Sequence, residues 1–128
     1  MNENQKVLLL VENEALILIS LQVSLNNAGF HVLTAAHGMA AIEQLNSADN
    51  NISGLITDVD LSNGDNGWDI ARHARESNHS LPVVYMTGDG QDWASQGVPN
   101  SLVVRKPFAD IQIITAISTL LNNASEQS

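Results

Sequence analysis

Four short apolar runs in this 128-residue chain are each followed directly, or one residue later, by polar side chains that could do chemistry. In chain order these side chains are Glu12, Asn13 and Glu14, then Asp58 and Asp60, then Thr87, and last Lys106. Carboxylates can hold a hard cation such as Mg²⁺, or act as nucleophiles that form an acyl phosphate. A hydroxyl and an ammonium group can bind the equatorial oxygens of a phosphoryl group. The set predicts phosphoryl-transfer chemistry, provided that the fold brings its members together.

The apolar runs have the length and composition of buried strands. They are Val7–Val11, Gly54–Thr57, Val83–Met86 and Leu102–Val104, with His31–Ala36 as a weaker fifth candidate. Runs without polar alternation indicate strands that are covered on both faces, as in a parallel sheet. The sequence therefore predicts a sheet of five parallel strands.

Helical periodicity lies between these runs. Ile17, Leu21, Leu25 and Ala28 share one helix face, and Gly29 is a natural helix stop. Shorter patterns cover 41–45, 68–74 and 111–121, and a further short helix is expected within 90–97. The alternation predicts an open, doubly wound α/β fold with helices on both faces of the sheet. In such sheets ligands bind beyond the carboxyl ends of the strands, where the polar side chains are expected to meet.

Four segments, in this order and at this spacing, resemble the bacterial response-regulator receiver family, whose fold is flavodoxin-like. They read "VLLLVENEALIL", "GLITDVDL", "PVVYMTGDG" and "VVRKPF". The resemblance implies that Asp58 accepts the phosphoryl group, that Thr87 hydrogen-bonds it and that Lys106 pairs with it. Pro107 is expected to shape the loop after Lys106 through a cis peptide bond.

The resemblance also implies a Mg²⁺ site. Glu12, Asn13, Asp58 and the backbone carbonyl of Asp60 are the expected ligands. Asn13 departs from the family pattern, because two carboxylates are usual where this chain has Glu12-Asn13. An amide keeps the oxygen ligand but loses one negative charge, which predicts weaker metal binding. Glu14 follows at once and is left open as a further ligand.

Three other positions depart from the family pattern. Val103 stands where many receivers carry an aromatic residue that reports phosphorylation. Thr87 and Lys106 are 19 positions apart, fewer than is common, so the fourth helix or its loops must be short. Ser62 occupies a position that is often proline.

Composition and charge limit the compartments and partners that are expected for the protein. The formal charge of −9 disfavours binding to nucleic acid, and the absence of cysteine fits a reducing compartment. No apolar run is long enough to cross a bilayer, so we expect a cytoplasmic protein without membrane contact. We expect one receiver domain over residues 1–128, with its core at about 5–122 and no output domain. Its expected partners are a sensor histidine kinase or histidine phosphotransfer protein, and a downstream protein.

Two other interpretations stay open at this stage. A haloacid-dehalogenase-like phosphatase also uses an aspartyl phosphate, and "DVDLS" resembles its motif; 57 residues precede Asp58, however, and only Asp110 and Glu126 supply carboxylates after Lys106. A pseudo-receiver would keep the fold as an interaction module without the chemistry, and Asn13 favours it. The receiver interpretation predicts a signalling domain rather than an enzyme, with Mg²⁺ as its cofactor.

Overall fold

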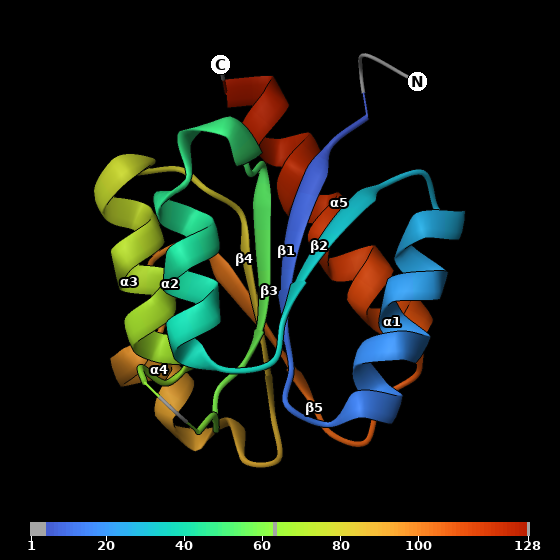
Figure 1. Ribbon diagram of the computed structural model, residues 1–128, viewed down its shortest axis with the longest axis vertical. Coiled ribbons are helices and arrows are strands. Elements are labelled where there is room, and N and C mark those ends of the chain that lie inside the picture. Colours follow the sequence, from blue (N-terminus) through green and yellow to red (C-terminus); the bar gives the residue numbers. More distant parts are fainter. Residues whose placement is uncertain (1–4, 63, 128) are drawn as a thin grey trace.

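The computed structural model describes residues 5–62 and 64–127. It contains a sheet of five strands, all parallel, in the order β2-β1-β3-β4-β5 (Figure 1). The strands are β1 (Val7–Val11), β2 (His31–Ala35), β3 (Gly54–Asp58), β4 (Val83–Thr87) and β5 (Ser101–Arg105). The predicted doubly wound fold is confirmed, and the order of the strands reverses between β1 and β3.

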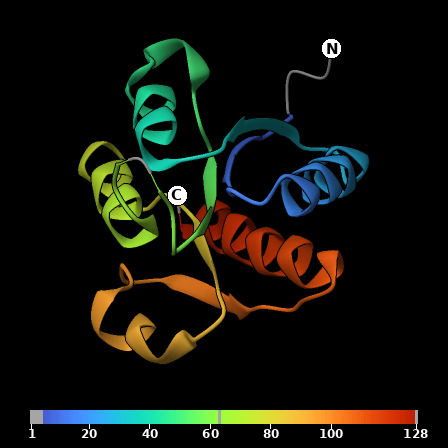
Figure 2. The ribbon, with the colours of Figure 1, turned by 60° about the horizontal axis from the view of Figure 1, so that its bottom comes forward.

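Helices cover both faces of the sheet (Figure 2). The α-helices are α1 (Ala15–Asn27), α2 (Gly38–Asn46), α3 (Gly67–Ser77), α4 (Trp93–Gln96) and α5 (Asp110–Gln127); short 3-10 helices are η1 (Ala48–Asn50) and η2 (Gly90–Asp92). Helices α1 and α5 lie on one face, and α2 and α3 on the other. None of the helices described is long and apolar enough to cross a membrane.

Strand residues alternate between two hydrophobic clusters, one on each face. On β1, Leu8 and Leu10 pack with α1 and α5, whereas Leu9 and Val11 pack with α2 and α3. All four side chains are fully buried. Double burial explains why these strands appear in the sequence as unbroken apolar runs.

Two of the helix boundaries rest on local chemistry. Gly29, which follows α1, has φ of 102°, a conformation that a residue with a side chain rarely adopts. Asn66 caps α3 by accepting a hydrogen bond from the Asp69 N–H. Gly29 therefore ends α1 as its position in the sequence predicts, whereas the Asn66 cap is known from the structure alone.

The fourth helix is abbreviated, as the short spacing between Thr87 and Lys106 predicts. α4 has four residues, and three side-chain hydrogen bonds hold it and the residues that follow it in place. The Tyr85 hydroxyl of β4 accepts a 3.1 Å hydrogen bond from the Val98 N–H. The Trp93 indole N–H donates to Ser101 Oγ at 3.0 Å, and Arg72 of α3 donates to the Gln96 backbone carbonyl. The connection from α4 to β5 is therefore fixed by side chains rather than by helix length.

Tyr85 is the central residue of this anchoring. Its ring is fully buried and lies 4.5 Å from that of Trp68, with an interplanar angle of 54°. Burial raises the pKa of the Tyr85 hydroxyl above its usual value, so it stays protonated and neutral at pH 7. A single aromatic side chain thus joins β4, α3 and the segment before β5.

We predict that Tyr85→Phe lowers the free energy of unfolding by about 1–2 kcal/mol, because it leaves the buried Val98 N–H without a partner. Urea unfolding followed by circular dichroism measures the change. Ser95→Ala removes an exposed hydrogen bond of the same segment and serves as the control, with an expected loss below about 0.5 kcal/mol. Equal stabilities of Tyr85→Phe and the wild type would show that this hydrogen bond does not hold the segment.

Candidate functional site

Strand register brings the four central side chains to one edge of the sheet. Val11 of β1 pairs with Thr57 of β3, so Glu12 and Asp58 leave neighbouring strands at the same level. Asp58 itself pairs with Met86 of β4, one residue before Thr87. The Lys106 N–H donates to the Thr87 carbonyl at 2.7 Å, which places β5 beside β4 at this point. The sequence predicted that Asp58 and Thr87 directly follow their strands. In the structure each is instead the last residue of its strand.

Lys106 lies between two buried carboxylates. Its Nζ is 3.0 Å from Glu12 Oε1 and 3.3 Å from Asp58 Oδ2. Glu12 is fully buried and Asp58 is 4% exposed, whereas the Lys106 side chain retains 23% exposure. The other Glu12 oxygen, Oε2, accepts a hydrogen bond from the Glu14 N–H at 2.9 Å. The cluster holds two negative charges and one positive charge, so it is not neutralised internally.

Burial is the main reason why the pKa of Asp58 is raised from 3.8 to about 6, and the nearby Glu12 charge adds to the effect. Lys106 acts in the opposite direction but does not cancel them. For Lys106, burial lowers the pKa, yet its contacts with Glu12 and Asp58 outweigh burial and the net shift is upward. Lys106 is therefore a cation at neutral pH, and a second positive charge near Asp58 would stabilise the carboxylate further.

Thr87 is buried beside this cluster. Its hydroxyl donates to the Asp89 carbonyl at 2.9 Å and accepts from the Asp89 N–H at 3.2 Å. The hydroxyl is thus bonded to the backbone of its own loop, and not to Asp58, in the structure. The Lys106–Pro107 peptide bond is cis, as the sequence analysis expected.

The remaining candidate ligands lie at the rim of the cluster. Asn13 and Asp60 are exposed; Asn13 directly follows Glu12, and Asp60 lies two positions after Asp58. Glu14 is also exposed, and its backbone rather than its side chain contacts Glu12. Among the residues that the structure describes, no three histidine, cysteine or acidic side chains converge on a common point.

The donor set nevertheless fits a hard cation. Glu12 Oε1 is buried, and among the residues that the structure describes its one charged contact is the ion pair with Lys106 Nζ at 3.0 Å. Lys106 also pairs with Asp58, so one ammonium serves two buried carboxylates and one negative charge is left for a further cation to balance. Glu12 and Asp58 would supply two charged oxygens, while Asn13 and the Asp60 carbonyl would supply neutral ones, which suits Mg²⁺ with retained waters.

Gly67 is a site residue that the sequence analysis did not single out. A Cβ at this position would collide with the Asp58 carbonyl oxygen and with Cα of Val59. The Gly67 N–H donates to the Val59 carbonyl at 2.9 Å, so the start of α3 lies directly against the end of β3. The signal in the sequence was a glycine directly after a helix-capping asparagine, nine positions beyond Asp58.

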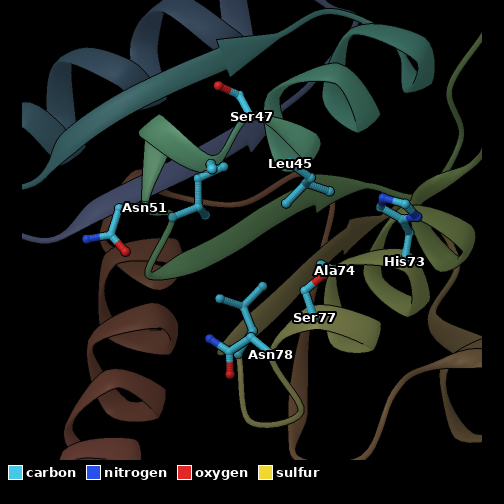
Figure 3. A pocket seen from close by; sticks show the side chains of 10 residues that line it. Leu45, Ser47, Asn51, His73, Ala74, Ser77 and Asn78 are labelled. Atoms are coloured by element: carbon cyan, nitrogen blue, oxygen red, sulfur yellow. The ribbon is translucent and has the colours of Figure 1, made fainter.

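A separate cavity of about 150 Å³ lies away from this cluster (Figure 3). It is lined by the ends of α2 and α3 and by residues before β3 and β4, among them Leu45, His73 and Ser77. These residues are near the amino ends of the strands, whereas the carboxylates lie at the carboxyl ends. Nothing in its lining joins it to the Glu12–Asp58–Lys106 cluster.

Known proteins resemble this chain in sequence and in fold. The family model of the response regulator receiver domain matches residues 8–118. The transcriptional regulatory protein CusR of Escherichia coli is 31% identical over 123 residues, which cover 92% of this chain and 52% of that protein. The chain therefore spans about half the length of this curated relative.

Solved structures show the same fold. A response regulator receiver protein from Sinorhizobium medicae has a TM-score of 0.87 and 39% identity, with 94% of this chain and 98% of that chain covered. The chemotaxis response regulator CheY4 of Vibrio cholerae has a TM-score of 0.80 at 20% identity, over 91% of this chain and 99% of that chain. The second likeness concerns the fold alone.

The raised pKa of Asp58 predicts a pH-dependent stability. The pKa of the Asp58 carboxyl is about 6 in the folded chain and about 3.8 in the unfolded chain. The folded state binds more protons between these values, so this group destabilises the fold as pH rises from about 4 to about 6. Without divalent metal, Asp58→Asn should be more stable than the wild type at pH 7, by on the order of 2 kcal/mol, with the advantage shrinking toward pH 4.

Urea unfolding in a chelator at pH 4 and pH 7 measures this difference. Asp49→Asn changes an exposed aspartate of η1 and is the control. Its free energy of unfolding should differ from that of the wild type by the same amount at both pH values. A pH-independent difference between Asp58→Asn and the wild type would contradict the proposed electrostatics of the cluster.

Proposed function

The chain belongs to the response regulator receiver domain family, and we propose that it accepts a phosphoryl group on Asp58 from a phosphohistidine donor. The observation that carries the proposal is the contact of one lysine with two buried carboxylates at the carboxyl edge of the sheet. Receiver domains are signalling domains that interact with histidine kinases and downstream effectors. This family assignment favours the receiver interpretation over that of a haloacid-dehalogenase-like phosphatase.

The proposed reaction is an in-line displacement at phosphorus. An Asp58 carboxylate oxygen forms the new P–O bond while the P–N bond to the donor histidine breaks, and the imidazole leaves with the electron pair. Lys106 pairs with one phosphoryl oxygen. The Thr87 hydroxyl gives up its hydrogen bond to the Asp89 carbonyl and donates to a second phosphoryl oxygen. Family members generally bind Mg²⁺ here, and when bound it would neutralise charge on the incoming phosphoryl group.

A groove beside Lys106 supports approach of a protein donor. Glu14, Leu16 and Ile17 of the α1 end line it on one side, and Lys106, Pro107 and Phe108 line it on the other. Leu16 is 84% exposed, which is unusual for a large apolar side chain next to a reactive centre. We propose that a histidine kinase or histidine phosphotransfer protein docks on this groove, in the cytoplasm.

The signal to a downstream protein is proposed to pass through the η2 loop. Val103 offers no aromatic ring that could turn, and its β-branched side chain has little rotamer freedom. Gly88 would tolerate a side chain, since nothing lies within 4 Å of a Cβ placed there, so the backbone has room to move. The anchors at Gln96 and Val98 confine this motion to the residues before α4.

We predict that the chain gains one phosphoryl group on incubation with a small phosphodonor and Mg²⁺, and that Asp58→Asn does not. Intact mass measures the gain. Asp60→Asn is the matched control, because it changes the neighbouring exposed aspartate, whose side chain is not proposed to react; it should be labelled like the wild type. Labelling of Asp58→Asn would overturn the acceptor assignment, and an unlabelled wild type would favour the pseudo-receiver.

We predict that Asn13→Asp tightens Mg²⁺ binding by on the order of tenfold, equivalent to about 1.4 kcal/mol, because it restores one charged ligand. Titration calorimetry measures the affinity. Asn78→Asp adds the same charge at the end of α3, near the amino edge of the sheet, and should leave the affinity unchanged within about twofold. Equal affinities of Asn13→Asp and wild type would show that residue 13 does not contact the metal.

A further inference from the structure

The groove beside Lys106 has two walls that belong to segments far apart in the chain. One wall is the start of α1, as far as Ser20, and the other is the connection from β5 to α5, as far as Asp110. Ser20 follows Glu14 by six positions, which is about 9 Å along a helix. The two walls meet where Asp110 contacts Ser20.

Asp110 joins the walls through one carboxylate oxygen. Its Oδ2 accepts a hydrogen bond from Ser20 Oγ and another from Ser24 Oγ, each 2.7 Å long. This length is typical of a hydroxyl that donates to a charged oxygen, which makes one of the stronger hydrogen bonds in proteins. Ser20 and Ser24 are four positions apart, so both hydroxyls lie on the same face of α1. Two donors from one helix thus hold the first turn of the other.

The remaining contact between α1 and α5 is apolar. Leu21 and Leu25 of α1 pack in the same cluster as Ile117 of α5. Helix α1 contains no charged residue, and its two serines are its only hydroxyl side chains. Among the described residues, no salt bridge and no other side-chain hydrogen bond joins the two helices. Apolar burial is non-directional, so the Asp110 carboxylate supplies the contact that fixes how the two first turns are spaced.

Asp110 is itself held by the start of its helix. It is the first residue of α5, where the helix dipole favours a negative charge. The Ala109 N–H donates to Gln112 Oε1 at 2.8 Å, and the Gln112 N–H donates to the Ala109 carbonyl at 2.9 Å. These bonds close the first turn, so the carboxylate is presented to α1 from a rigid element rather than from a loop.

The spacing of the walls matters for one class of phosphodonor. A histidine carried by a protein reaches Asp58 only after that protein docks, and a misplacement on the order of 1 Å can slow a reaction severely. A small donor such as acetyl phosphate needs no docking surface. Its reaction with Asp58 is therefore expected to be insensitive to the groove and to the residue that fixes it.

We infer that Asp110 is a positioning residue, which sets the spacing of the two groove walls for a protein phosphodonor by bonding Ser20 and Ser24. The inference deepens the proposed function and rests on it, because it concerns how the phosphoryl group reaches Asp58. Ser24 is half-buried and does not line the groove. It can therefore influence a docked donor only through Asp110.

Phosphotransfer kinetics of the full chain with two donors test this inference. The protein donor is the autophosphorylated histidine kinase that, within a purified set, labels the wild type at the lowest concentration; the small donor is acetyl phosphate with Mg²⁺. Asp110→Ala should raise the KM for the kinase about tenfold, and Ser24→Ala about threefold, with kcat unchanged within about twofold. Labelling by acetyl phosphate should stay within about twofold of the wild type for both variants.

Asp69→Ala is the matched control. Asp69 is an acid in the first turn of α3, as Asp110 is in α5, but it pairs with Arg72 of its own helix and lines neither wall. Its loss should change the KM for the kinase by less than about twofold.

The spacing of the walls can also be measured without any donor. The chain has no cysteine, so Leu16→Cys and Ala109→Cys place one spin label on each wall. Pulsed electron paramagnetic resonance gives the distribution of distances between the labels. Asp110→Ala should broaden this distribution by at least about twofold, and Asp69→Ala should leave it unchanged.

Three results would overturn the inference. One is a distance distribution that Asp110→Ala does not alter. Another is a wild-type KM for Ser24→Ala when Asp110→Ala has raised the KM, because Asp110 would then contact the donor directly. The third is an equal loss with both donors, which would indicate a general defect of the variant. Failure of the proposed function is distinguishable, since neither donor would then label the wild type, and the inference would fall with it.

Discussion

The rest of the site depends on the placement of two carboxylates and one ammonium group where the protein has largely excluded water. Glu12 and Asp58 are buried side by side, and Lys106 reaches both from the end of β5. One cation cannot neutralise two anions, so the cluster carries a net negative charge, which burial makes costly. That cost raises the pKa of Asp58, through burial first and the Glu12 charge second. The same imbalance is what a divalent cation would correct.

The parallel sheet is what makes this placement possible. Each of the four side chains comes from a different strand end, and parallel strands bring all their carboxyl ends to one edge. The register of β1 with β3 and of β4 with β5 sets the depth of each group. Gly67 lets α3 start against the Asp58 carbonyl, so the backbone of Asp58 is held by α3 as well as by the neighbouring strands. Rigid elements rather than loops thus position the groups proposed to react.

The region between Thr87 and Lys106 shows how a short segment can remain ordered. A four-residue helix contributes little stability of its own. Tyr85 of β4 and Arg72 of α3 compensate with hydrogen bonds to the α4–β5 segment, and Trp93 of α4 bonds Ser101 at the start of β5. These anchors all lie after η2, which is why the proposed response to Thr87 is assigned to Gly88 and the η2 turn.

The sequence by itself determined the strands, the main helices and the identity of the central groups, because these depend on local order along the chain. Unbroken apolar runs indicate strands covered on both faces. A polar residue that directly follows such a run must lie at the carboxyl end of the strand. The short spacing before Lys106 likewise predicted an abbreviated fourth helix. Only the tertiary structure decided that Lys106 contacts Glu12 as well as Asp58, that Thr87 bonds its own loop, and that the start of α3 at Gly67 packs against the Asp58 backbone. Those facts depend on burial and on distances between residues far apart in the chain, and no pattern of neighbours in a sequence encodes them.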